Sequence, residues 1–139
     1  MDIKEIEQFL RIHGIRPSHH RIRVYHYLME KRNHPSVDVI YQELVREIPT
    51  LSKTTVYSTL ELFLEKGVVS LITIDENERR YDADTSLHGH FRCNTCGRIF
   101  DVRLNTGIGD LNGMDDFEIS ESHIYFKGLC PECLKKSTS

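Results

Sequence analysis

The spacing of hydrophobic residues predicts four helices in the first 67 residues. Ile3, Ile6 and Leu10 recur at helical intervals until Gly14. Each later helix is preceded by a serine whose side chain can accept a hydrogen bond from the free N–H groups of the first turn. These serines are Ser18, Ser36 and Ser52, and the apolar stripes that follow them lie in residues 22–29, 37–44 and 56–64. Gly67 ends the last helix.

After residue 67 the pattern changes to short extended segments. Residues 68–74 and 79–82 flank a polar turn and predict a β-hairpin, so that the first part of the chain has the order of a winged helix. Further strand-like segments are residues 89–93, 98–104, 117–120 and 124–127. The glycine-rich stretch 105–116 favours at most a short or irregular helix. The predicted fold is α+β, with a winged-helix domain at 1–83 and a small α/β domain at 84–139.

Length, composition and net charge exclude several classes of function. A chain of 139 residues with a net charge of −3 is too short for a large enzyme with its own cofactor domain, and it is not generally basic. Any affinity for DNA must therefore come from a local patch. The first residues do not resemble a signal peptide, and the longest apolar run is far below the roughly 20 residues of a membrane span. We therefore expect a cytoplasmic protein with reduced thiols and no membrane partner.

The strongest local signal is a pair of Cys-x-x-Cys motifs. Cys93 and Cys96 form the first, and Cys130 and Cys133 form the second. Each spacing lets two thiolates bind one ion, and four thiolates complete a closed tetrahedral Zn²⁺ site, with Gly97 suited to the turn after the first pair. A closed site leaves no position for substrate, so the predicted zinc is structural. The alternative is a redox pair or disulfides.

A second candidate metal site contains histidine and carboxylate side chains. His88 and His90 are alternate residues at the start of a predicted strand, so both imidazoles can reach one ion. The other candidate ligands are His34, Asp82 and Asp101. Such nitrogen and oxygen donors are harder than thiolates and suit Fe²⁺, Mn²⁺ or Zn²⁺. Taken singly, His34 is best explained as a loop residue, and Asp82 and Asp101 as solvated strand ends.

The face of the fourth predicted helix opposite its apolar stripe is suited to enter a DNA major groove. This face carries Lys53, Thr54, Tyr57 and Ser58. Cationic residues at the start of the second helix, Arg16, Arg21 and Arg23 with His19 and His20, are candidates to bind phosphates. The alternative is that all of these are ordinary solvated side chains.

Taken together, the motifs resemble the ferric-uptake regulator (Fur) family of metal-dependent repressors over nearly the whole chain. The matching segments are residues 16–21, His34-Pro35, 52–60, Arg80-Tyr81-Asp82, 88–93, Cys96-Gly97 and the closing Cys130/Cys133 pair. The resemblance implies a winged helix joined by a hinge to an α+β dimerisation domain, and a homodimer that binds a palindromic double-stranded operator. It also implies a repressor and not an enzyme.

The same resemblance assigns roles to individual residues. It implies that His34, Asp82, His88, His90 and Asp101 bind a regulatory Fe²⁺ or Mn²⁺, that the four cysteines bind Zn²⁺, and that Tyr57 contacts bases. A further site found in several relatives is incomplete here, because Leu87, Gly89 and, without gaps, Ile108 occupy its positions, leaving only His123.

One residue bears on the signal that is sensed. Asp101 stands where many iron sensors carry Glu, which resembles the peroxide-responsive branch, whose oxidised ligands would correspond to His34 and His88. An iron-sensing or a zinc-sensing repressor is the alternative within the family. A haem-responsive regulator, suggested by Cys130-Pro131, and a metalloenzyme are the alternatives outside this reading.

Overall fold

The computed structural model describes residues 1–75, 77–86, 89–103, 113–120 and 122–137. The chain divides into two compact units, Met1–Thr85 and Ser86–Ser139, whereas the hydrophobic pattern predicts the division between residues 83 and 84. Of the described helices, none is long and apolar enough to span a bilayer.

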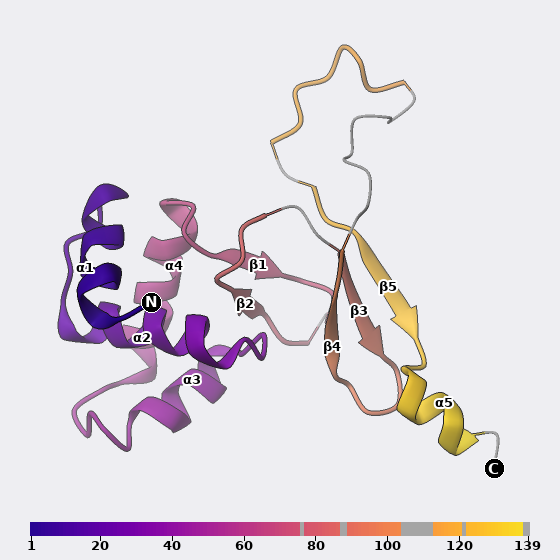
Figure 1. The fold of residues 1–139 in the computed structure, drawn as a ribbon, viewed down its shortest axis with the longest axis horizontal. Coiled ribbons are helices and arrows are strands. Elements are labelled where there is room, and N and C mark those ends of the chain that lie inside the picture. Colours follow the sequence, from indigo (N-terminus) through magenta and orange to yellow (C-terminus); the bar gives the residue numbers. More distant parts are fainter. Residues whose placement is uncertain (76, 87–88, 104–112, 121, 138–139) are drawn as a thin grey trace. The chain divides into compact units, whose positions relative to one another are not determined.

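The first unit contains the four predicted helices (Figure 1). They are α1 (Ile3–Ile12), α2 (His19–Lys31), α3 (Val37–Leu44) and α4 (Lys53–Glu65). The predicted serine caps are confirmed, because the side chains of Ser18, Ser36 and Ser52 each accept a hydrogen bond from the backbone N–H three residues later. Helix α1 begins with a capping box between Asp2 and Glu5 that the apolar pattern does not indicate.

A β-hairpin completes the winged helix after α4. Strands β1 (Ser70–Ile72) and β2 (Arg80–Asp82) are antiparallel, with Leu71 opposite Tyr81. The first strand is shorter than predicted, because Val68 and Val69 pack in the helical core instead of continuing the sheet. The N–H of Tyr81 donates to the carbonyl of Pro35 at 3.0 Å, which ties β2 to the loop before α3.

Helix α4 is held by its buried face. Val56, Leu60 and Phe63 are fully buried there, and the edge of the Phe63 ring meets Tyr25 of α2 with 5.9 Å between ring centroids. The opposite face, which carries Lys53, Thr54, Tyr57 and Ser58, is exposed. The burial pattern of α4 therefore follows the predicted apolar stripe.

Replacing Phe63 by alanine is expected to destabilise the first unit by about 3–5 kcal/mol, because it removes a large buried ring and leaves a cavity. Urea unfolding followed by circular dichroism measures this change. Ile12→Ala is the matched control, since Ile12 is 71% exposed and its truncation should change the free energy of unfolding by less than about 0.5 kcal/mol. Equal losses in the two variants would contradict the placement of Phe63.

The second unit is a three-stranded sheet followed by a short helix. Its strands are β3 (Gly89–Cys93), β4 (Ile99–Val102) and β5 (Tyr125–Gly128), in the order β4-β3-β5. Strand β4 is antiparallel to β3, whereas β5 is parallel to it. Helix α5 (Pro131–Ser137) follows β5 directly (Figure 1).

One prediction for the second unit is wrong. Residues 117–120 do not form a strand, because no neighbouring strand pairs with them in the described part of the chain. Helix α5 begins at Pro131, where the missing N–H of proline costs nothing. Of the stretch 105–116, residues 105–112 lie outside the described residues.

Candidate metal centres and nucleic-acid interface

The four cysteines come together in the second unit. Their sulfur atoms all lie within 4.8 Å of one another, and the Sγ atoms of Cys96 and Cys130 are 3.9 Å apart. A tetrahedral zinc with Zn–S bonds of about 2.3 Å holds its sulfurs about 3.8 Å apart. The parallel pairing of β3 and β5 produces this cluster, because it sets Cys93 opposite Gly128, two residues before Cys130. The four side chains therefore fit a closed zinc site.

Local contacts shift the pKa values of these thiols in different directions. Backbone N–H groups of Cys96 and Cys130 donate to the Sγ of Cys93, and they lower the pKa of Cys93 to about 5. The pKa of Cys133 is raised to about 12 by its side-chain hydrogen bond with Cys130 and by burial. Four deprotonated thiols this close would repel one another. A divalent cation offsets their negative charge, and its binding releases the protons that the thiols still carry. The turn at Gly97, whose φ is +75°, accommodates the approach of the first pair as predicted.

A cation already lies beside the thiols. The Nη2 atom of Arg98 is 3.9 Å from the Sγ of Cys130 and 2.8 Å from the carboxylate of Glu132. The guanidinium therefore offsets negative charge on the second cysteine pair. Cys130 belongs to this four-sulfur cluster, so its presence is explained without a role in binding haem.

The first unit presents a histidine–carboxylate pair. The Nε2 atom of His34 is 3.6 Å from a carboxylate oxygen of Asp82, and both side chains are buried. Two ligands of one ion at bond lengths of about 2.1 Å lie roughly 3–3.5 Å apart, so the spacing suits a shared metal. The backbone N–H of Asp84 donates to the other oxygen of Asp82 at 2.9 Å and orients the carboxylate.

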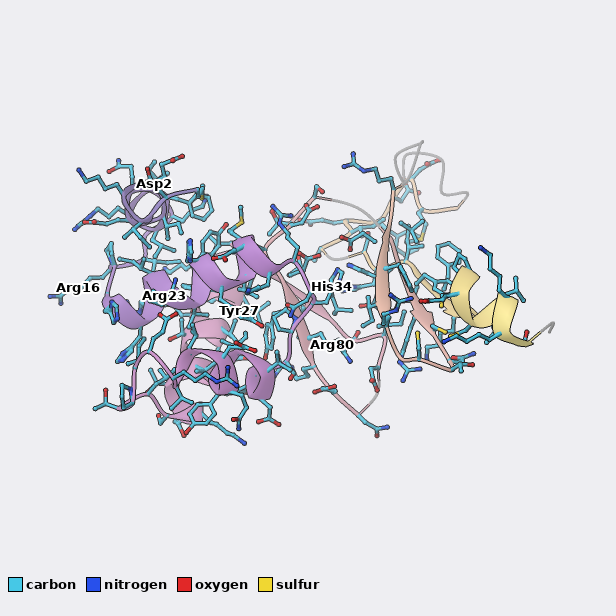
Figure 2. All side chains as sticks on the ribbon, turned by 60° about the horizontal axis from the view of Figure 1, so that its bottom comes forward. Asp2, Arg16, Arg23, Tyr27, His34 and Arg80 are labelled. Atoms are coloured by element: carbon cyan, nitrogen blue, oxygen red, sulfur yellow. The ribbon has the colours of Figure 1, made fainter. Side chains whose placement is uncertain are left out.

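The backbone at His34 is held in an uncommon conformation. Its φ of 51° is in the left-handed region, which costs a non-glycine residue roughly 1–2 kcal/mol. Arg80 donates from Nη1 to the His34 carbonyl at 3.2 Å and thereby stabilises this conformation (Figure 2). Arg80 acts on the site through this backbone contact, which the sequence does not indicate because the two residues are 46 positions apart.

The second unit presents a similar pair. His90 on β3 lies opposite Asp101 on β4, with 3.4 Å between Nε2 and a carboxylate oxygen. The His90 side chain is 8% exposed and that of Asp101 is 47% exposed, so the pair is open to solvent on the carboxylate side. The antiparallel register of β3 and β4 alone brings these two candidate ligands together.

Two further candidate histidines have different outcomes. His88 lies outside the described residues. His123 is exposed, and its Nδ1 is 3.1 Å from the hydroxyl of Tyr125, whose ring lies near that of His90. His123 therefore contacts Tyr125, whose ring lies near the candidate ligand His90.

Most of the predicted DNA-facing residues surround one pocket in the first unit. The pocket has a volume of about 540 Å³ and lies between the starts of α2 and α4. Its lining includes Arg16, Arg21, Thr54 and Ser58 together with His20. Arg21 is oriented by donating to the Arg16 carbonyl at 2.9 Å. Cations, hydroxyls and two helix N-termini all favour an anion such as a phosphate.

Lys53 and Tyr57 lie on α4 and are not among the lining residues of this pocket. Lys53 forms an ion pair with Asp38 at 2.9 Å, and the hydrogen bond to that carboxylate raises the pKa of Lys53. Arg23 likewise pairs with Glu47 of the first unit at 3.0 Å. The cations around α4 are thus partly compensated by carboxylates, as expected for a chain with a net charge of −3.

A family model described as the ferric uptake regulator family matches residues 12–127. The chain belongs to the ferric uptake regulator family. This match confirms the family that the order of the motifs along the sequence predicts. The α+β architecture with its winged helix agrees with that family.

Individual relatives extend the match over nearly the whole chain. The peroxide-responsive repressor PerR of Staphylococcus aureus (strain Mu50 / ATCC 700699) is 33% identical over 138 residues, which cover 97% of this chain and 93% of that protein. A structure of PerR from Streptococcus pyogenes, described as the basis of peroxide sensing and gene regulation, has a TM-score of 0.54 at 27% identity and covers 94% of this chain and 92% of its own. A zinc uptake regulator complexed with zinc and DNA has a TM-score of 0.72 at 20% identity, covers 99% of this chain and 95% of its own, and shares the fold.

Proposed function

We propose that this chain is a metal-dependent transcriptional repressor that binds a palindromic DNA operator as a homodimer and responds to peroxide. The observation that carries the proposal is that each unit presents a histidine–carboxylate pair with the spacing of metal ligands: His34 with Asp82, and His90 with Asp101. The curated relatives are named as repressors, which favours a regulator over an enzyme for this chain. The proposed location of this regulator is the cytoplasm.

The winged-helix unit is the proposed DNA-binding domain. Its exposed α4 face carries Lys53, Thr54, Tyr57 and Ser58, and the adjoining pocket offers Arg16 and Arg21 to a backbone phosphate. Phosphate contacts position such a domain, whereas contacts from the helix to base edges supply specificity. The zinc regulator of the same fold that is described with DNA supports this assignment.

The proposed regulatory site takes Fe²⁺ or Mn²⁺ and draws its ligands from both units. His34 and Asp82 would come from the first unit, and His88, His90 and Asp101 from the second. Mixed nitrogen and oxygen donors suit these ions, whereas the four thiolates suit structural zinc. An ion that binds all five residues favours one relative placement of the two units, and it shifts the population only by its greater affinity for that state. A dimer in that state would hold its two α4 helices at the spacing of a palindrome.

The proposed signal is peroxide. When bound, Fe²⁺ would supply the one-electron reduction of peroxide, and the histidine ligands that hold it would be the side chains exposed to the resulting oxidant. By family resemblance these ligands are His34 and His88. Asp101 is short and half exposed, which leaves access for peroxide at the side of His90. The peroxide-responsive name of the repressor that is 33% identical supports the same signal.

Exposure of the Fe²⁺-loaded protein to peroxide is expected to release DNA and add oxygen to the histidine ligands. The probe is a palindromic duplex selected from a random library with the zinc-containing, Mn²⁺-loaded protein, and binding is measured by fluorescence anisotropy without oxygen. Mass spectrometry of peptides containing His34 and His88 measures the added oxygen. The Mn²⁺-loaded protein is the matched control and should retain the duplex.

Three outcomes would contradict parts of this proposal. If no metal-dependent duplex can be selected, the protein is not a metal-dependent repressor. If the Fe²⁺ form retains its duplex and its peptides gain no oxygen, the signal is iron itself and not peroxide. If only Zn²⁺ restores binding to metal-stripped regulatory sites, the protein senses zinc.

A further inference from the structure

A guanidinium group of the hairpin contacts the exposed tyrosine of α4. The Nη1 of Arg79, the residue before β2, donates to the hydroxyl of Tyr57 at 3.4 Å, and its Nη2 pairs with Glu61 of α4 at 3.0 Å. The guanidinium carbon also lies 5.9 Å from the centroid of the Tyr57 ring. One side chain of the hairpin therefore contacts two successive turns of the DNA-facing helix.

The same guanidinium also lies near the core. Its carbon lies 5.8 Å from the ring centroid of Tyr81, which is fully buried on β2. The backbone of Tyr81 is fixed by its pairing with Leu71 and by its hydrogen bond to Pro35. The Arg79 guanidinium thus lies near both the buried ring of Tyr81 and the ring of Tyr57, which is 45% exposed.

We propose that Arg79 is a positioning residue for DNA recognition: it holds the Tyr57 side chain in its DNA-reading conformation before DNA binds. The proposal rests on the proposed DNA-binding function. Ordering a side chain during binding weakens affinity by about 2- to 10-fold, and a side chain that is ordered beforehand avoids this loss. Glu61 contributes by pairing with the Nη2 atom of Arg79, which fixes the position of the guanidinium.

The arrangement also argues against Arg79 as a direct phosphate ligand. The carboxylate of Glu61 at 3.0 Å compensates its charge, and both terminal nitrogens already have partners on α4. A direct phosphate contact would change the dependence of affinity on salt by a slope of about 0.9, whereas positioning of Tyr57 leaves that slope unchanged. Salt titration therefore separates the two roles.

The test uses the Mn²⁺-loaded full chain, the selected palindromic duplex and a scrambled duplex of the same composition. Arg79→Gln is expected to weaken binding to the selected duplex by about 2- to 10-fold and to leave the scrambled duplex and the salt slope unchanged. In a Tyr57→Ala background the same substitution should have no further effect, because the side chain through which it acts is absent. Arg79→Lys should recover only part of the affinity, since an ammonium cannot contact Glu61 and Tyr57 as a planar fork does.

Glu61→Gln makes the test sharper because the two explanations predict different changes in the ratio of the affinities for the selected and the scrambled duplex. Loss of a negative charge near DNA should strengthen binding to both duplexes if only electrostatics matter, whereas loss of the Arg79 anchor should weaken binding to the selected duplex relative to the scrambled one. Lys66→Gln, at the exposed C-cap of α4, is the matched charge control and should preserve that ratio. Thermal unfolding of every variant separates positioning from loss of fold.

The results that overturn the inference differ from those that overturn the function. If the wild type selects no duplex, the proposed function fails. If the wild type binds and Arg79→Gln binds equally well, or if its loss persists in the Tyr57→Ala background, Arg79 does not act through Tyr57.

Discussion

Replacing Cys93 by serine is expected to remove zinc from the second unit and to unfold it. Zinc bound to four thiolates contributes about 10–16 kcal/mol in small domains, which is as much as the entire folding free energy of a typical protein. The described core of this unit consists of Cys93, Cys130 and Cys133, with Phe91 and Phe100 packed against it. Without the metal, little apolar burial remains to hold β3, β5 and α5 together.

Zinc content by atomic emission should fall from about one per chain to less than about 0.1, and the proposed dimer should dissociate in sedimentation experiments. Helical circular dichroism should largely persist, because α1 to α4 have a separate core. Thr95→Ser, inside the same motif, is the matched control and should keep both zinc and dimer. A Cys93→Ser protein that retains one zinc and dimerises would show that the four thiolates do not form a structural site.

Replacing His90 by alanine is expected to abolish the metal-dependent part of DNA binding. His90 is buried on the central strand and faces Asp101, so it contributes the imidazole of the histidine–carboxylate pair in the second unit. A shift from 1:99 to 99:1 in favour of the binding-competent state needs about 5.5 kcal/mol of differential affinity for the metal. Loss of one of the proposed ligands should remove most of this, and the gain in affinity on adding Mn²⁺ should fall by at least roughly 100-fold.

Anisotropy titrations with the selected duplex, with and without Mn²⁺, measure this gain. The structural zinc should be retained, because the cysteine cluster does not include His90. His13→Ala is the matched control, since His13 is exposed at the end of α1 and contacts only the Phe9 carbonyl and ring among the interactions described. Metal-dependent binding that survives in the His90 variant would exclude His90 as a regulatory ligand.

The local features of this chain could be predicted because each depends on residues close in sequence. A serine cap contacts an N–H three residues away, and the apolar stripe of α4 repeats within one or two turns. The Cys-x-x-Cys motifs are local in the same sense, so the donor atoms of the zinc site could be named without the fold. The strand predicted at residues 117–120 is wrong because extended structure depends on a partner strand, which local propensity does not reveal.

Contacts between distant residues could not be predicted in this way. Arg79 and Tyr57 are 22 positions apart, and Arg80 and His34 are 46 apart, yet each pair is joined by a hydrogen bond. The sequence pattern names no partner for either arginine, although Arg80 lies in a segment that matches the family. Only the hairpin register and the packing of β2 on the helices give them specific partners.

The sequence by itself determined the family, the helices of the winged helix and the kinds of atoms available to bind metal, because these follow from local periodicity, capping and the spacing of donor residues. Only the tertiary structure shows how the fold brings donors that are distant in sequence together. Parallel pairing of β3 with β5 brings Cys130 to Cys93, and antiparallel pairing of β3 with β4 brings Asp101 to His90. The physical reason is that strand register depends on burial and hydrogen bonding along the whole sheet, and a shift of one residue would turn each ligand to the opposite face.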